Sequence, residues 1–228
     1  MAPLIRVQNL RFRYPDGVEA LCGVDFSLLP GETVALLGAN GSGKTTFLLH
    51  LLGLLQGEGE IDICGKRLEK STRGHARQKI GVLFQDSDDQ LFMPTVEEDV
   101  AFGPRNLELP EAEVERRVES ALTRVSVEDL RERAPHHLSA GQKRRVALAG
   151  VLAMDPEIIL LDEPATFLDP PSRQELIDVM RNLPHAQVIV THDIPLARAL
   201  ATRAVFFQAG RIVAEGSVDE LAAQFNWS

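Results

Sequence analysis

Cysteine is scarce in this chain of 228 residues, and its two copies, Cys22 and Cys64, stand far apart. Neither forms a Cys-x-x-Cys pair or lies near a histidine cluster, so their spacing argues against a zinc site or a redox pair. Two buried, reduced thiols are the simpler interpretation. The sequence also lacks internal repeats, low-complexity segments and a disordered tail.

Long apolar runs are missing as well. Apolar stretches, such as residues 47–49 with Leu51 and Leu52 beyond His50, are far shorter than a membrane span. The first residues, 1–6, lack the charged head, long apolar region and cleavage site of a secretory signal. We therefore expect a protein that stays in the cytoplasm.

Positive charge is in deficit, because 24 Lys and Arg residues face 33 Asp and Glu residues, for a formal net charge of -9. Nucleic acid demands a basic face, so this balance argues against wholesale binding to it, although local basic clusters occur. The hydrophobic content of 44% is normal for a globular protein. The length favours one α/β core with a subordinate lobe over two independent domains.

The order of the apolar segments predicts a mainly parallel sheet covered on both faces. Residues 5–29 alternate around a turn at 15–17, which predicts a small antiparallel β-lobe. Between about 86 and 150, apolar residues three or four apart predict a mainly helical insertion. Strands are expected at 33–37, 60–64, 80–85, 158–161, 188–190 and 205–207, with helices at 44–54 and from about 171 and 194.

Residues 38–45 read Gly-Ala-Asn-Gly-Ser-Gly-Lys-Thr, which fits a phosphate-binding loop. Consecutive N–H groups can point at phosphate oxygens only in conformations that glycine tolerates, which accounts for Gly38, Gly41 and Gly43. Lys44 is expected to reach the β- and γ-phosphates of ATP, and Thr45 to supply its hydroxyl to Mg²⁺. A strand before the loop and a helix after it disfavour the alternative of a simple glycine-rich turn. The nucleotide contacts expected here are Gly38, Asn40, Gly41, Ser42, Gly43, Lys44, Thr45 and Thr46.

Two carboxylates, Asp162 and Glu163, follow an apolar strand-like run. A carboxylate buried beside phosphates is costly unless a cation compensates it, so Asp162 is expected to reach Mg²⁺ through water. A lone Asp-Glu pair is usually a helix cap or a surface pair. The position after four aliphatic residues and before Pro164 disfavours that alternative.

Residues 138–142, Leu-Ser-Ala-Gly-Gln, lie between these two motifs, and together the three resemble the ATP-binding-cassette (ABC) ATPases. The resemblance extends from Tyr14 to His192 and implies the P-loop NTPase fold of that family, with an antiparallel β-lobe and an inserted helical subdomain. We expect one ABC ATPase domain over 1–228. Its core would occupy 1–85 and 151–228, and its helical subdomain about 86–150.

The resemblance implies four catalytic residues. Glu163 would polarise the attacking water, which requires hydrogen-bond reach to that water. His192 would contact the γ-phosphate, and Gln85 would contact the metal and water and link the core to the helical lobe; taken alone, both could be ordinary surface residues. Lys44 completes the catalytic set, and the metal set is Thr45, Gln85 and Asp162.

Further contacts implied by the resemblance lie outside the phosphate-binding loop. Tyr14 matches an aromatic residue on which adenine stacks, although an ordinary β-lobe aromatic remains the alternative. Ser139 and Gly141 open a helix that is predicted to begin at Gln142, and so they form an anion site. In this family that site closes on ATP held by a second subunit, and Asp169 matches the loop that crosses to it. The expected unit is a dimer, either a homodimer or a pair with a related cassette, which two ATP molecules hold together.

Residues 83–92 and 95–104 resemble the ATPases of cobalt and nickel importers and of energy-coupling-factor (ECF) vitamin importers. The resemblance implies an ATPase at the cytoplasmic face of the membrane that powers uptake of a transition-metal ion or a vitamin such as biotin. Its partners would be a transmembrane coupling protein and a substrate-binding membrane subunit. Arginines of the coupling protein would meet Asp86, Asp88 and Asp89, while a solvated acidic loop is the equal alternative.

Some features depart from the family pattern. Ala140 replaces the commoner second glycine, and Phe167 stands where a small residue often precedes Leu-Asp. We also expect the chain to lack the extra C-terminal domain that many relatives carry, which would make the dimer depend more on ATP or the membrane partner. A soluble ABC ATPase of DNA repair or translation is the alternative function, but it predicts a coiled-coil insertion or tandem cassettes. A regulatory module without turnover is disfavoured by Glu163 and His192. The transported substrate is not encoded in these motifs.

Overall fold

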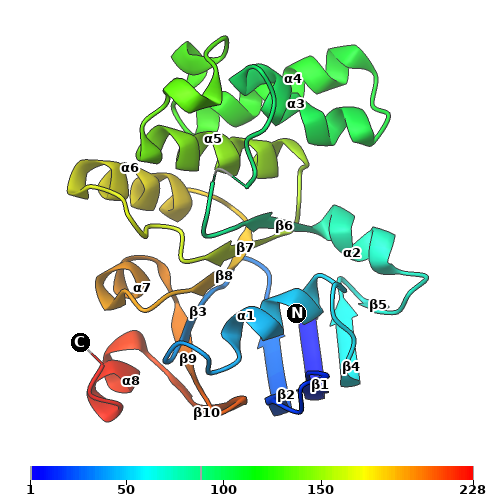
Figure 1. The fold of residues 1–228 in the computed structure, drawn as a ribbon, viewed down its shortest axis with the longest axis vertical. Coiled ribbons are helices and arrows are strands. Elements are labelled where there is room, and N and C mark those ends of the chain that lie inside the picture. Colours follow the sequence, from blue (N-terminus) through cyan, green and yellow to red (C-terminus); the bar gives the residue numbers. More distant parts are fainter. Residues whose placement is uncertain (1, 88, 228) are drawn as a thin grey trace. The chain divides into compact units, whose positions relative to one another are not determined.

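The computed structural model describes residues 2–87 and 89–227. They form two compact units (Figure 1). The first comprises Met1–Ile80, Glu157–Asp162 and Pro184–Ser228, and the second comprises Gly81–Pro156 and Glu163–Leu183. The helical segment expected at about 86–150 lies within the second unit.

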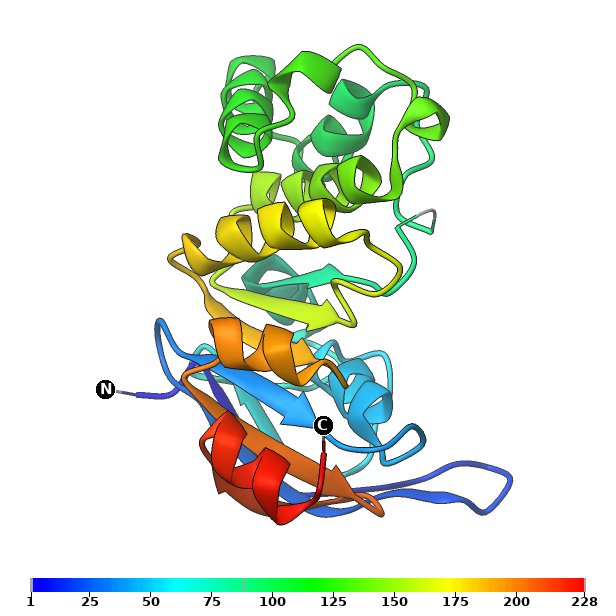
Figure 2. The ribbon, with the colours of Figure 1, turned by 90° about the vertical axis from the view of Figure 1, so that its left-hand side faces the viewer.

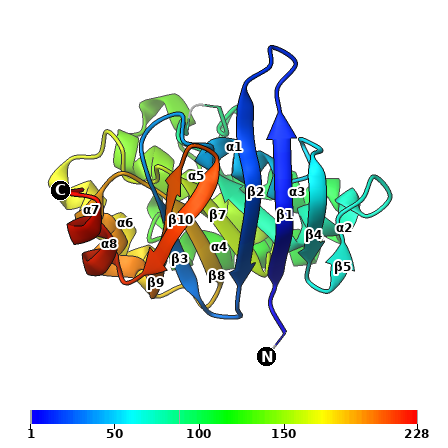
Figure 3. The same ribbon diagram turned by 90° about the horizontal axis from the view of Figure 1, so that it is seen from below.

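A small antiparallel sheet opens the first unit, with strand order β2-β1-β4-β5 (Figure 3). Every second residue is buried at the start of β1, where Ile5 and Val7 alternate with exposed positions, as a sheet with one covered face requires. The antiparallel β-lobe expected from the sequence is therefore confirmed. Its strands are β1 (Ile5–Arg13), β2 (Glu19–Leu28), β4 (Glu58–Ile63) and β5 (Lys66–Arg67).

The core sheet of the first unit has the order β10-β9-β3-β8-β7. Its strands β3, β7, β8 and β9 are parallel, while β10 is antiparallel to β9. Every residue of β3 and β8 is buried, as expected for parallel strands covered on both faces. The strands are β3 (Thr33–Leu37), β7 (Ile158–Asp162), β8 (Ala186–Val190), β9 (Arg203–Gln208) and β10 (Arg211–Gly216).

Helices cover both faces of this sheet. On one face, α7 (Ile194–Leu200) and α8 (Val218–Gln224) lie side by side and pack on Ala35, Leu37 and Phe206 (Figure 2). On the other, α1 (Lys44–Leu51) packs through Phe47, whose ring lies 5.5 Å from that of Phe207. Neighbouring residues of β9 therefore point to opposite layers, as the two-residue period of a strand dictates.

The second unit is mainly helical. The chain enters it along β6 (Ile80–Leu83), and α3, α4 and α5 pack against one another. The side of α4 that is buried consists of Val114, Val118, Ala121 and Leu122, the residues whose spacing predicted a helix. The helices are α3 (Val96–Asn106), α4 (Glu111–Arg124), α5 (Ala140–Ala153) and α6 (Pro170–Arg181), with 3-10 turns at Glu128–Leu130 and Pro135–His137.

The boundaries differ from the sequence-based expectations in several places. Helix α1 ends at Leu51, three residues before the expected 54, and β6 ends two residues before Gln85. Four elements were not expected at all: β5, α2 (Arg73–Lys79), β10 and α8. No helix in residues 2–87 and 89–227 has the length and apolar character to span a bilayer.

Candidate functional site

The loop between β3 and α1 needs glycine at two positions. Gly38 has φ +136, and a Cβ there would lie 2.2 Å from the carbonyl oxygen of Phe207. Gly43 has φ +110, and its Cβ would lie 2.5 Å from the carbonyl oxygen of Ala20. Any side chain at either position would collide with backbone as well as strain the loop. The close packing fixes the path of the loop into α1.

Lys44 organises the interior of this loop. Its ammonium nitrogen Nζ donates to the carbonyl oxygens of Gly38 at 2.6 Å and Ala39 at 2.9 Å, and Ser42 Oγ lies 3.4 Å away. The lysine is only 7% exposed. Helix α1 begins here after Gly43, which provides no side-chain cap. A buried cation and an uncapped helix N-terminus both attract anions, so the loop fits the phosphate chain of a nucleotide.

The sheet register aligns the ends of three strands beside this loop. Leu36 of β3 pairs with Val190 of β8, and Val190 pairs with Asp162 of β7. Because adjacent strands lie about 4.8 Å apart, the Cα of Asp162 lies roughly 10 Å from that of Leu36. His192 follows two residues after Val190 and is exposed. The first unit therefore brings Asp162 and His192 to the carboxyl edge of the sheet, where the loop begins.

The oxygen donors of the first unit suit a hard cation. The Thr45 hydroxyl and the Asp162 carboxylate are ligand types that Mg²⁺ accepts, with water and phosphate completing its shell. Within the described parts of the chain, no three His, Cys, Asp or Glu residues group together as a protein-only metal site. The third residue of the predicted metal set, Gln85, belongs to the second unit and is exposed.

Tyr14 lies next to the first turn of α1. Its hydroxyl is 3.1 Å from Thr46 Oγ1, and its ring meets that of Phe12 edge-on, with centroids 4.9 Å apart. The aromatic residue is thus held against the helix that follows the phosphate-binding loop. Stacking of adenine on this ring stays a prediction.

In the second unit, Ser139 caps α5. Its Oγ accepts a hydrogen bond from the backbone N–H of Gln142 at 3.2 Å, and Gln142 Oε1 accepts one from the Ser139 N–H at 3.0 Å. This reciprocal capping box starts the helix at Ala140, two residues before the expected position. A hydroxyl can accept and donate together, so the cap leaves Ser139 able to donate to a phosphate.

A close contact joins the start of α5 to α6. A Cβ on Gly141 would lie 2.5 Å from both Cβ and Oγ of Ser172. Ser172 in turn donates from its N–H to Asp169 Oδ1 at 2.9 Å and from its hydroxyl to Asp169 Oδ2 at 3.0 Å. These bonds lower the pKa of the Asp169 carboxyl. Ser172, which sequence reasoning missed, thus connects two predicted site residues.

Glu163 opens a tight turn. Its φ is +46, in the left-handed region that residues other than glycine rarely adopt. The turn is closed by a bond from the Thr166 N–H to the Glu163 carbonyl at 3.2 Å, and the Thr166 hydroxyl lies 3.4 Å from Glu163 Oε2. The direction of the carboxylate is therefore restrained from both its backbone and its side chain.

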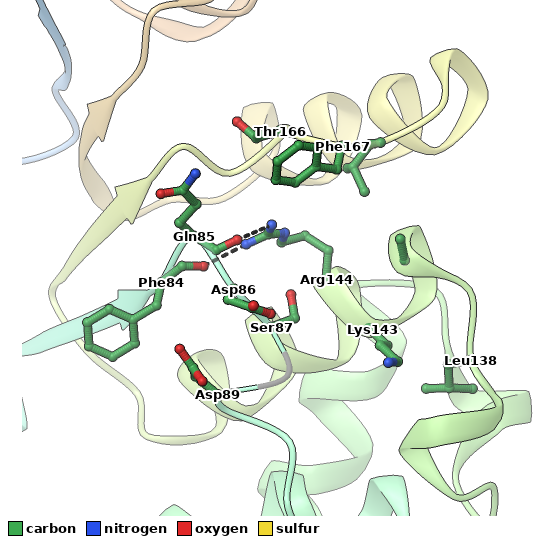
Figure 4. Close-up of a pocket in the computed structure, with 12 residues that line it drawn as sticks. Phe84, Gln85, Asp86, Ser87, Asp89, Leu138, Lys143, Arg144, Thr166 and Phe167 are labelled. Carbon is green, nitrogen blue, oxygen red and sulfur yellow. Dashed lines mark hydrogen bonds between the residues drawn. The ribbon is translucent and has the colours of Figure 1, made fainter. Parts of the chain in front are cut away.

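Arg144 of α5 holds the segment that contains Gln85. Its Nη1 donates to the carbonyl oxygen of Phe84 at 2.6 Å and its Nη2 to that of Gln85 at 2.5 Å (Figure 4). Burial lowers the pKa of the guanidinium, and the nearby Asp86 carboxylate partly opposes this shift. Sequence reasoning missed Arg144. Its only signal was an arginine at helical spacing from Gly141 and Leu148 on the buried side of α5.

A cavity of about 710 Å³ lies between this segment, α5 and residues 166–168. Both signs of charge line it, with Asp86 and Asp89 on one side and Lys143 and Arg144 on α5 (Figure 4). Two of the three acidic residues expected to receive a partner's arginines are thus brought to one cavity. Asp88 lies outside the described residues.

Known proteins resemble the chain over nearly its whole length. The family model described as "ABC transporter" matches residues 21–166. A putative ABC transporter ATP-binding protein of Streptomyces avermitilis is 52% identical over 223 residues, covering 97% of this chain and 85% of the relative. The energy-coupling factor transporter ATP-binding protein EcfA of Carboxydothermus hydrogenoformans is 48% identical over 216 residues, covering 93% and 80%.

Solved structures agree with these relatives. CbiO1 of Clostridium perfringens, described as part of the ABC transporter complex CbiONQ, has a TM-score of 0.91 and 36% identity, covering 99% of this chain and 92% of that one. The cassette MJ0796, solved as a dimer in a post-hydrolysis state with ADP and phosphate, has a TM-score of 0.82 and 29% identity, covering 94% and 98%. The fold inferred from the motifs is confirmed.

Proposed function

Since the chain belongs to the ABC transporter family, we propose that it is the ATP-hydrolysing subunit of an importer of the ECF or cobalt type. The observation that carries this proposal is the loop in which Lys44 is held at the uncapped N-terminus of α1, a built site for the phosphates of ATP. The similarity to EcfA and CbiO1 over more than nine-tenths of the chain supports the importer class.

The residues of the first unit bind and orient ATP in this proposal. Lys44 and the N–H groups of the loop neutralise the phosphates, Tyr14 stacks on adenine, and His192 contacts the γ-phosphate. Thr45 and Asp162 would hold Mg²⁺, with Gln85 of the second unit as the third predicted ligand, and the ion would supply positive charge that offsets the charge of the phosphates. Glu163 accepts a proton from the attacking water, because a carboxylate beside that water makes it a better nucleophile.

The proposed active unit is a dimer of this chain or a pair with a related cassette. Ser139, Gly141 and Asp169 all belong to the second unit, while the phosphate-binding loop belongs to the first. In a composite site, the N-terminus of α5 from one subunit contacts the γ-phosphate held by the loop of the other. The dimeric structure of the related MJ0796 cassette supports this assembly.

We further propose that the chain works at the cytoplasmic face of the membrane, where a transmembrane coupling protein docks at its 710 Å³ cavity. Asp86 and Asp89 would pair with arginines of that protein, because guanidinium and carboxylate groups match geometrically. The cargo would be a transition-metal ion such as cobalt or nickel, or a vitamin such as biotin, bound by a separate membrane subunit.

Glu163→Gln tests the catalytic part of the proposal. The variant keeps the phosphate contacts but loses the base, so it should bind ATP, stop turnover and accumulate as a dimer, as measured by phosphate release and analytical ultracentrifugation. A monomer at saturating ATP would contradict the composite site.

A double variant, Asp86→Asn with Asp89→Asn, tests the docking cavity. The variant should bind ATP normally. When the tagged chain is purified from gently solubilised membranes, less of the coupling protein should co-purify with the variant than with the unmodified chain. Equal recovery would refute the docking role. Recovery of soluble partners alone with the unmodified chain would instead favour a non-transport ABC ATPase.

A further inference from the structure

Phe167 is an apolar side chain directed into solvent by a strained loop. It is 88% exposed, more than any other large apolar residue in the described ranges 2–87 and 89–227. Its φ is +65, a value that is a genuine outlier for a bulky residue. Both the exposure and the strain are unfavourable for an isolated chain. Strained backbone of this kind clusters at ligand clamps and switch regions, so the strain at Phe167 points to a contact outside the chain.

The first unit carries a cavity that fits an aromatic ring. It measures about 370 Å³ and lies between residues 39–42 of the phosphate-binding loop, the end of β9 and two aromatic residues, Phe225 and Trp227. A cavity of about 150 Å³ can already hold benzene. The space is therefore ample for one phenylalanine side chain.

The aromatic wall of this cavity is itself ordered. The Phe225 ring stacks on Phe206 at 3.8 Å with an interplanar angle of 4°, and Trp227 meets Phe206 edge-on at 5.5 Å. Aromatic rings prefer offset-stacked and edge-to-face partners, so a further ring gains contact here beyond simple burial.

We propose that Phe167 of one copy of this chain enters the Phe225–Trp227 cavity of a second copy. The inference rests on the dimer proposed above. Each copy carries both the inserted ring and the receiving cavity, so a two-fold dimer makes the contact twice and closes on itself. The cavity borders the loop proposed to hold ATP, and the dimeric MJ0796 cassette aligns with 94% of this chain. A second copy is thus the occupant that these observations favour.

The receiving cavity also touches the segment that carries His192. The indole Nε1–H of Trp227 donates to the backbone carbonyl of His192 at 3.3 Å. A ring packed against Trp227 would hold this indole in place and, through it, the backbone of the proposed γ-phosphate contact. The inserted Phe167 would thereby couple dimer formation to this hydrogen bond.

The test uses the purified chain without a membrane partner, in the Glu163→Gln background with saturating ATP. Because Trp227 is the only tryptophan, its fluorescence reports on this cavity alone. Dimer formation should shift its emission to shorter wavelength as the ring excludes water. Phe167→Ala should weaken the dimer by on the order of 100-fold, since two buried rings are lost per dimer. Its Trp227 emission should stay unshifted even at concentrations that restore the dimer.

Two further variants control for folding and for general loss of apolar surface. Phe92→Ala removes another ring that is 61% exposed, and it should leave both the dimer and the emission shift unchanged. In a Trp227→Leu background, Phe167→Ala should weaken the dimer by a clearly smaller factor, because the partner ring is gone. Circular dichroism of each variant checks that it is folded.

The outcomes separate this inference from the dimer proposal. If the parent Glu163→Gln chain stays monomeric with ATP, the proposed dimer itself is wrong. If it dimerises and Phe167→Ala changes neither the affinity nor the emission, only the insertion is wrong. Equal effects of Phe167→Ala with and without Trp227 would also overturn it. So would a loss confined to membrane-partner recovery, which would assign Phe167 to the 710 Å³ cavity that it also lines.

Discussion

Replacing Arg144 by methionine should release the segment around Gln85. The variant keeps an unbranched but shorter side chain and removes the two donors to the carbonyl oxygens of Phe84 and Gln85. It leaves α5 intact, because methionine is a good helix former. The change therefore isolates the attachment of this segment from the folding of the helix.

The size of the effect follows from the two bonds and the burial of the arginine. A hydrogen bond to a charged group contributes about 1.5 to 3 kcal/mol, so the pair gives roughly 3 to 6 kcal/mol in gross terms. Two effects reduce this figure: the guanidinium no longer needs to be desolvated, and the freed carbonyls border a cavity where water can reach them. We expect a net loss of about 2 kcal/mol, which is roughly a 30-fold increase in local opening.

Hydrogen exchange measured by mass spectrometry reads this opening directly. Exchange in residues 84–90 should accelerate roughly 30-fold in Arg144→Met, with little change in the β-lobe, and kcat should fall more than the KM for ATP rises. Arg144→Lys should be intermediate, because one ammonium cannot match two carbonyls as a planar fork does. Arg116→Met, which alters an exposed arginine of α4, is the matched control. Unchanged protection of residues 84–90 in Arg144→Met would refute the restraint.

Two other features give direct tests. Gly141→Ala should lower ATPase activity about tenfold or more, because its Cβ would collide with Ser172 at 2.5 Å and overpacking costs about 1 to 3 kcal/mol. Adding Ser172→Gly should restore much of the activity. A lack of recovery in the double variant would argue against the contact. The Cys64 thiol has its pKa raised to about 11 by burial and the nearby Glu157 carboxylate. Since only the thiolate reacts, its alkylation by iodoacetamide should rise about tenfold per pH unit until pH approaches 11, and a plateau near pH 9 would contradict this environment.

The buried strands were predictable because almost all of their residues are apolar. Residues 33–37 and 158–161 could hardly be exposed, and both are strands in the structure. The missed elements are short and half-polar, so periodicity gave no clear signal. Helix α8 did carry a local one: Ser217 and Glu220 form a capping box, the Ser-x-x-Glu pattern that marks a helix start.

The candidate site likewise contains residues that a local sequence pattern predicts and residues that it does not. The phosphate-binding loop is one continuous segment whose glycines report its conformation, so a local pattern sufficed to find it. The role of Arg144 could not be assigned from the sequence because its partners are the carbonyl oxygens of Phe84 and Gln85, 60 and 59 positions earlier in the chain. Backbone acceptors carry no residue identity, and no spacing rule could have pointed to them.

Helix α5 connects the predicted site residues of the second unit. Its Gly141 packs on Ser172, whose hydroxyl donates a hydrogen bond to the Asp169 carboxylate. One turn later, its Arg144 donates a hydrogen bond to the carbonyl oxygen of Gln85. Residues three apart lie on one side of a helix, so a displacement of α5 moves both contacts together. A change at the Gln85 segment, where we propose that the membrane partner docks, would therefore reach the Asp169 loop through two adjacent contacts of a rigid helix. That arrangement offers a physical route by which docking could alter the surface that Phe167 presents to a second copy.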